Sequence, residues 1–168
     1  MGLNRMLFKN SKKDDFILYL ERTIETFKDD NIDSIGSNAF AYCSLLTSID
    51  VPNVTSIGDH AFDSCSSLTS IHLPNVTSIG NYAFAYCSSL TSIDVPNVTS
   101  IGDHAFDSCS SLTLIDVPNV TSIGSGAFAY CSSLTSIHFA AKNKETIETL
   151  SAYSSKFGAT NATIYFDL

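Results

Sequence analysis

The sequence predicts a repeat solenoid, in which short coils of chain stack along one axis. Three observations predict this fold class. A 22-residue motif occurs five times in register between Ile35 and Phe139, its apolar positions recur in every copy, and all four prolines of the chain fall at one position of it. Each coil is too short to bury its own apolar face, so it gains a core only by stacking on its neighbours.

Identical residues recur at identical positions in the five copies. The Ile-Gly pairs begin at Ile35, Ile57, Ile79, Ile101 and Ile123. The aromatic position of each copy is filled by Phe40, Phe62, Phe84, Phe106 and Phe128. The cysteines are Cys43, Cys65, Cys87, Cys109 and Cys131. Such columns predict coils that stack at about 4.8 Å, the spacing between neighbouring strands.

Within one coil, the S-I-D-V-P segment that starts at Ser48 alternates polar and apolar residues. This alternation predicts a short strand with Ile49 and Val51 facing inward, which the following proline ends. Val54 and Ile57 provide a second inward pair.

A longer pattern is superimposed on the 22-residue period. The segment DHAFDSCSSLT begins at Asp59 and again at Asp103, 44 residues later, and AFAYCS begins at Ala39, Ala83 and Ala127. The array is therefore a duplicated two-coil unit, and odd and even coils present different surfaces.

These residues resemble the BspA-like class of the leucine-rich repeat superfamily. The resemblance rests on L-T-S-I-D-V-P-N-V-T-S-I-G-D-H-A-F-D-S-C-S-S from Leu46 to Ser67, and on I-G-x-x-A-F-x-x-C in each of the five copies. It implies a curved, right-handed, β-rich coil with one strand per repeat on the concave face and little regular helix elsewhere. Proteins of this class are commonly surface adhesins or host-interaction proteins, and many carry export signals or anchors.

The chain divides into an N-terminal cap (1–34), the repeat array (35–139) and a C-terminal cap (140–168). Solenoids need caps because each end of the array exposes apolar core. Helical spacing of apolar residues and a possible capping box at Ser11 predict an N-terminal helix within 11–30. A helix over Asn143–Phe157, ended by Gly158, and a last strand over Ala162–Phe166 are predicted for the C-terminal cap.

Charge is scarce and unevenly placed. Only 15% of the residues are charged and the net charge is −8. The array carries seven Asp, four His and no Lys, Arg or Glu. This balance excludes nucleic acids and anionic membranes as partners, since both need a basic surface. No apolar run is long enough to span a membrane. The N-terminus lacks a secretory h-region, which predicts a cytoplasmic or virion-associated protein, or a surface protein if a signal has been removed.

The sequence does not indicate a catalytic or metal site in the cysteine and histidine columns. Each coil supplies one cysteine without a CxxC pair or a neighbouring histidine, whereas zinc needs four convergent ligands. We interpret the cysteines as buried small hydrophobic residues. No metal, no cofactor and no catalytic residue is predicted, and the protein is expected not to be an enzyme.

One polar column lies on the strand that is expected to face the concave surface. Its members, called the strand strip below, are Asp50, His72, Asp94, Asp116 and His138. Neighbouring Asp and His are expected to pair across coils. The strip has two interpretations: an alternation that relieves repulsion between carboxylates, or a surface that contacts a partner. Serines flank it, with Leu114 as the apolar exception.

The turn of each coil carries further polar and aromatic residues. Asp59 and Asp63, like Asp103 and Asp107, are four residues apart, and two carboxylates are too few for a strong calcium site. We expect them to be solvated. The tyrosines of the same turns, such as Tyr86, are candidates for a protein interface.

The sequence therefore predicts a non-enzymatic binding module or scaffold that recognises a protein or surface ligand. The alternative is a structural building block of a larger assembly, such as a phage particle or a cell-surface layer. The oligomeric state is left open.

Overall fold

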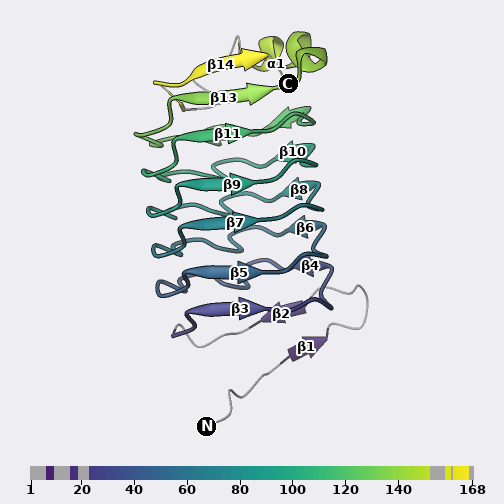
Figure 1. Ribbon diagram of the computed structural model, residues 1–168, viewed down its shortest axis with the longest axis vertical. Coiled ribbons are helices and arrows are strands. Elements are labelled where there is room, and N and C mark those ends of the chain that lie inside the picture. Colours follow the sequence, from purple (N-terminus) through teal and green to yellow (C-terminus); the bar gives the residue numbers. More distant parts are fainter. Residues whose placement is uncertain (1–6, 10–15, 19–22, 152–157, 160, 167–168) are drawn as a thin grey trace.

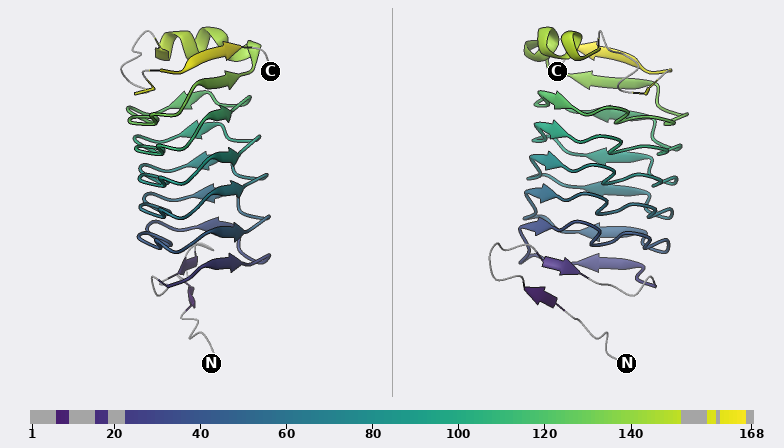
Figure 2. Two further views of the ribbon diagram at one scale, coloured as in Figure 1. Left: turned by 60° about the vertical axis from the view of Figure 1, so that its left-hand side comes forward. Right: turned by 180° about the vertical axis from the view of Figure 1, so that it is seen from behind.

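The chain folds into a stack of coils that runs the length of the molecule (Figure 1). The computed structural model describes residues 7–9, 16–18, 23–151, 158–159 and 161–166. Each repeat contributes two short strands. One set of equivalent strands pairs in parallel from every repeat to the next, and the other set does so between some of the repeats. The two columns of strands run side by side along the stack (Figure 2). The predicted repeat solenoid is confirmed.

The first column is a continuous seven-stranded sheet in the order β1-β2-β4-β6-β8-β10-β12. Its strands are β1 (Leu7–Lys9), β2 (Phe16–Leu18), β4 (Ser34–Ile35), β6 (Ser56–Ile57), β8 (Ser78–Ile79), β10 (Ser100–Ile101) and β12 (Ser122–Ile123). From β4 onward serine pairs with serine and isoleucine with isoleucine. The resemblance implied one strand per repeat, so this second strand is an addition to the expectation.

The second column contains the predicted strands. They are β3 (Thr26–Lys28), β5 (Ser48–Asp50), β7 (Ser70–His72), β9 (Ser92–Asp94), β11 (Leu114–Asp116), β13 (Ser136–Phe139) and β14 (Thr163–Phe166). They pair as β3-β5, β7-β9 and β11-β13-β14. From β5 to β11 the central isoleucine is buried and both neighbours are exposed, as alternation along a strand requires.

A column of phenylalanines fills the core beside the turns. Phe40, Phe62, Phe84, Phe106 and Phe128 are fully buried. Successive rings are nearly parallel, with centroids 5.0 to 5.5 Å apart. The repeat of the sequence thus becomes a repeat in space, because one residue type can stack on itself at strand spacing.

The turns are joined between coils by backbone hydrogen bonds. The N–H of Phe62 donates to the carbonyl of Ala83 at 2.7 Å, and that of Phe84 donates to Ala105 at the same distance. Each turn also holds two residues with positive φ, such as Tyr82 at 55° and Tyr86 at 58°. Residues other than glycine occupy most of these positions, so the turns carry backbone strain.

The predicted N-terminal helix is wrong wherever the structure describes it. Phe16–Leu18 and Thr26–Lys28 are strands, while the possible capping box at Ser11 lies outside the described residues. Strand β3 pairs with β5, and Phe27 packs edge-on against Phe40 at 5.1 Å. The first coil presents unpaired strand edges that only extended chain can satisfy, and this requirement overrides the helical spacing.

The C-terminal cap follows the prediction in its described part. A 3₁₀ turn (Ala141–Asn143) leads into α1 (Lys144–Ser151), and β14 closes the second column. Ile147 is buried in the core. Ser136 pairs with Thr163, 27 residues later, so the last coil is five residues longer than the repeat. No helix in the described ranges has the length and apolarity to cross a membrane.

Candidate binding site

The strand strip forms one row on the second column of strands. Its residues follow the buried isoleucines of β5, β7, β9, β11 and β13 in the chain. Asp50, His72, Asp94 and Asp116 are exposed, and His138 is half-buried. The side chains of His72 and Asp94 are 66% and 61% exposed, which leaves them accessible to a partner.

The expected pairing across coils is confirmed for one pair. Nδ1 of His72 lies 2.6 Å from Oδ2 of Asp94. Asp50 pairs instead with Lys28 of the N-terminal cap. A hydrogen bond from the Lys28 ammonium to the Asp50 carboxylate raises the pKa of this ammonium, and the negative charge of Asp30 raises it further. Because these groups are exposed, the pairs add little to stability.

The other end of the strip is covered by the C-terminal cap. His138 lies opposite Asp116 in the strand register. Its ring stacks on that of Tyr165, with centroids 4.6 Å apart and planes 22° apart. Tyr165 is itself 42% exposed, so it continues the strip onto β14.

A shallow depression lies in the middle of the strip. Its volume is about 380 Å³, and it is lined by His72, Asp94, Ser70 and Ser92, with Ser48 at one end. Hydroxyls, a carboxylate and an imidazole therefore meet on one accessible surface. These groups can form hydrogen bonds to a polar or basic partner.

The turns of the array, residues 36–46 and their equivalents, are called the turn edge below. Here the expectation of solvated carboxylates is wrong for two residues. Asp63 and Asp107 are 9% and 8% exposed. Oδ2 of Asp63 lies 3.0 Å from Nδ1 of His60, and the hydroxyl of Ser64 donates to Oδ1 at 2.9 Å. Asp107 has the same partners two coils later, His104 and Ser108.

Asp59 and Asp103 remain exposed but also have a structural role. The N–H of Asn81 donates to Oδ1 of Asp59, and the N–H of Asp103 donates to Oδ1 of Asn81, both at 2.8 Å. The N–H of Ser125 donates to Asp103 in turn. The turn carboxylates thus act as acceptors that connect successive coils.

This geometry does not provide an activated nucleophile at the turn edge. Ser64 and His60 both bond to the carboxylate of Asp63. Nucleophilic catalysis instead needs the hydroxyl bonded to the imidazole, which would remove its proton. Within the described ranges, no group of three or more His, Cys, Asp or Glu could hold a metal ion.

The cysteines form a buried, hydrogen-bonded column. All five are buried. The thiol of Cys87 donates to the carbonyl of Phe62, in the preceding coil, at 3.2 Å. Cys65, Cys109 and Cys131 each make the equivalent bond to the phenylalanine of the coil before them. Burial raises the pKa of the thiols of Cys65, Cys87 and Cys109. Such thiols are protonated and poor nucleophiles at neutral pH.

The turn edge also exposes tyrosines in alternate coils. Tyr42, Tyr86 and Tyr130 are 53%, 55% and 77% exposed. Tyr82 differs, because its ring is stacked between those of His60 and His104. Tyr42, Tyr86 and Tyr130 thus present most of their surface to solvent.

Sequence reasoning missed the two cap residues that contact the strip, Lys28 and Tyr165. Both lie in strands that pair directly with the array, β3 with β5 and β14 with β13. The apolar centre of β14 allowed its strand to be predicted, but its register, which brings Tyr165 beside His138, depends on the extra length of the last coil.

Comparisons with known proteins place the chain. The family described as "BspA type Leucine rich repeat region (6 copies)" matches residues 30–157. A leucine-rich repeat protein of T. pallidum, known from its crystal structure, is 28% identical. The similarity covers 98% of this chain and 79% of that one, with a TM-score of 0.78.

A leucine-rich repeat protein from Eubacterium ventriosum is 26% identical, over 78% of this chain and 37% of that one, with a TM-score of 0.67. A search of the curated proteins finds no match to this chain. The family match covers the whole array and part of both caps. The chain therefore belongs to the BspA-type leucine-rich repeat family.

Proposed function

We propose that the protein is a non-enzymatic binding module that contacts a protein or a surface ligand through the strand strip. The observation that carries the proposal is the placement of one polar row on in-register strands, exposed over four coils and hollowed around His72 and Asp94. Repeat proteins bind partners on such extended surfaces.

The charge of the array favours a partner with basic groups. The array has no Lys or Arg, and two strip carboxylates, Asp94 and Asp116, are exposed. A basic segment of a partner complements this surface and gains speed of association from it. Nucleic acid, which is anionic, would be repelled.

The contacts of the turn edge support a non-enzymatic role. Its Ser-Asp-His clusters are arranged to hold a turn, and its thiols are buried and protonated. The histidine, aspartate and serine side chains of these clusters are hydrogen-bonded within the turn.

The experiment compares two double variants that each remove two negative charges. Asp94→Asn with Asp116→Asn neutralises the strip. Asp59→Asn with Asp103→Asn removes the two exposed charges of the turn edge while keeping its Oδ1 acceptors, as Asn81 does naturally. Immobilised wild-type and variant proteins are used to capture partners from the native source.

We expect the strip variant to lose a captured partner at least ten-fold and the turn variant to keep it. Equal capture by all three proteins would refute the strip as the binding surface. Self-association of the purified wild type into regular assemblies, lost in neither variant, would favour the building-block function instead.

A further inference from the structure

Three rings stack along the turn edge outside the hydrophobic core. His60, Tyr82 and His104 come from three successive coils. Their centroids are 5.0 and 4.9 Å apart, and their planes differ by 3° and 7°. All three residues have positive φ, between 53° and 55°. Each of these three coils adds one half-buried ring to the ladder, whereas the same column holds Asn38 in the first coil and Gly126 in the last.

The ladder ends abruptly at Gly126. The two-coil pattern places His60 with His104, and Tyr82 with residue 126, each 44 residues apart. Gly126 keeps the positive φ, 62°, but supplies no ring. A Cβ built on it would lie 2.6 Å from Cε1 of His104. The outer face of the His104 ring therefore meets a bare backbone instead of the next ring of the series.

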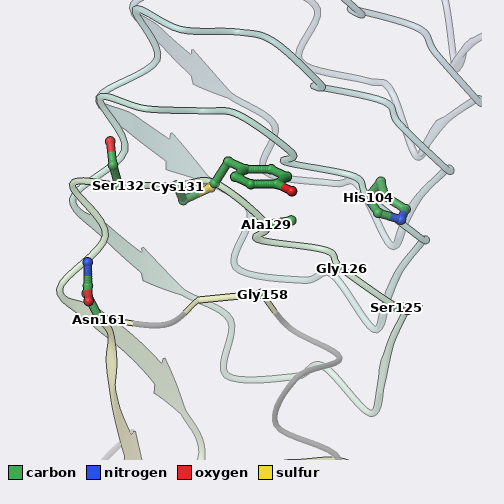
Figure 3. Close-up of a pocket in the computed structure, with 9 residues that line it drawn as sticks. His104, Ser125, Gly126, Ala129, Cys131, Ser132, Gly158 and Asn161 are labelled. Atoms are coloured by element: carbon green, nitrogen blue, oxygen red, sulfur yellow. The ribbon is translucent and has the colours of Figure 1, made fainter.

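A cavity of about 590 Å³ opens at this point. It is lined by His104, Gly126, Tyr130, Ser132, Gly158 and Asn161, among others. Figure 3 shows His104 at one end of the cavity and Ser132 with Asn161 toward the other. The volume lies within the range of small-ligand sites, about 300 to 1,000 Å³. The array thus has a hollow where its ladder lacks a ring.

The imidazole of His104 is held in place for stacking. Its Nδ1 lies 3.0 Å from Oδ2 of Asp107, which the hydroxyl of Ser108 also holds at 2.8 Å. A ring that is already held by a hydrogen bond loses little conformational freedom when a ligand stacks on it. Parallel, offset stacking of the kind seen between Tyr82 and His104 is a favourable arrangement for two rings.

We propose that this cavity binds the aromatic side chain of a protein partner, which stacks on His104 and replaces the ring that Gly126 lacks. The template within the protein is Tyr82, an aromatic amino-acid side chain that stacks on the same imidazole from the other side. Ser132 and Asn161, at the far end, offer hydrogen bonds to the backbone of such a peptide. This site is separate from the strand strip and does not depend on its function.

The first test is a titration of the wild-type protein with N-acetyl-tyrosinamide and N-acetyl-tryptophanamide, followed by NMR of the histidine Cε1–H signals. N-acetyl-leucinamide is the control probe. We expect a saturable upfield shift of the His104 signal with the two aromatic probes alone, caused by the ring above it. The His60 signal should stay in place, because the coil before it has Asn38, and not a glycine, at the equivalent position of the column. No shift at His104, or equal shifts at His60 and His104, would overturn the proposal.

The second test fills the vacancy. Gly126→Tyr places a tyrosine in the same column as Tyr82, and its Cβ requires the imidazole of His104 to shift, because Cε1 lies 2.6 Å from that position. This variant should bind the aromatic probes at least ten-fold more weakly than wild type. His104→Ala and His60→Ala form a matched pair, since each loses the same bond to a buried aspartate. Only His104→Ala should lose probe binding; equal binding by both would contradict the site. The wild-type titration decides the question even if a variant folds poorly.

Discussion

The strand strip and the turn edge contain the same residue types, aspartate and histidine, in different structural roles. On the strip, Asp94 is 61% exposed in its side chain and meets one histidine across coils. On the turn edge, Asp107 is buried and meets a histidine of its own turn as well as a serine. A carboxylate removed from water must be hydrogen-bonded to be tolerated. The turn carboxylates therefore maintain the fold, whereas the strip carboxylates remain available for contacts.

The difference also shows in the backbone. The turn edge has two residues of positive φ in each coil and buried thiols beneath it. The strand strip has ordinary extended backbone with alternating burial. Changes to the turn edge should therefore alter stability, and changes to the strip should alter binding. Three measurements test this difference.

The largest effect should come from alkaline pH acting on the thiols. The raised pKa values of Cys65, Cys87 and Cys109 mean that the folded protein keeps protons that the unfolded chain releases. Stability is fully present below the ordinary thiol pKa of about 8.5 and is lost as pH rises above it. Each thiol contributes about 1.4 kcal/mol for each pH unit in that range. Urea unfolding between pH 7 and 10 measures the slope.

The variant Cys87→Ala serves as the control for this slope. It removes one of the three shifted thiols, so the loss of stability per pH unit should fall by about one third. A slope that does not change in this variant would show that other groups cause the alkaline destabilisation.

The next effect concerns the buried carboxylate of the turn edge. Asp107→Ala leaves His104 and Ser108 without their acceptor, and we expect a loss of about 2 kcal/mol in the free energy of unfolding. Asp103→Asn, which keeps an acceptor for the N–H of Ser125, should change it by less than about 0.5 kcal/mol. Urea denaturation at neutral pH compares the two, and equal losses would contradict a special role for Asp107.

The smallest effect should be that of Asp94→Asn. The pair with His72 is highly exposed, and exposed pairs contribute between zero and about 1 kcal/mol. We expect the midpoint of urea unfolding to remain close to that of wild type, together with an unchanged far-UV spectrum. A loss as large as that of Asp107→Ala would show that the strip is structural, and would remove the basis for a binding surface there.

The repeat array could be predicted almost completely, because its residues recur in columns. Ile49, Val51, Val54 and Ile57 are all buried as the alternation indicates. The N-terminal cap could not be predicted in this way. Its helical spacing, which includes Ile24 and Phe27, is a local property, whereas the strands that form there are required by the open edge of the first coil.

The row of strip residues was predicted together with one of its contacts, that of His72 with Asp94, but the other contacts were not. The strip follows from counting along the repeat, whereas the pairing of Asp50 with Lys28 depends on the register of β3. The burial of Asp63 and Asp107 was missed for a similar reason. Their partners, a histidine three residues before and a serine one residue after, were visible in sequence, but the turn that brings them together requires positive φ at non-glycine residues.

Parallel pairing between successive coils has a mechanical consequence. Each coil contacts mainly the coil before it and the coil after it, so the coils can detach one at a time from an end of the stack. A coil of 22 residues, once detached, extends to roughly 70 Å, at about 3.3 Å for each residue. In the stack it occupied about 4.8 Å. Tension applied along the stack would thus lengthen the molecule in a series of similar steps, and the protein would act as an extensible tether whose extension grows with the number of repeats.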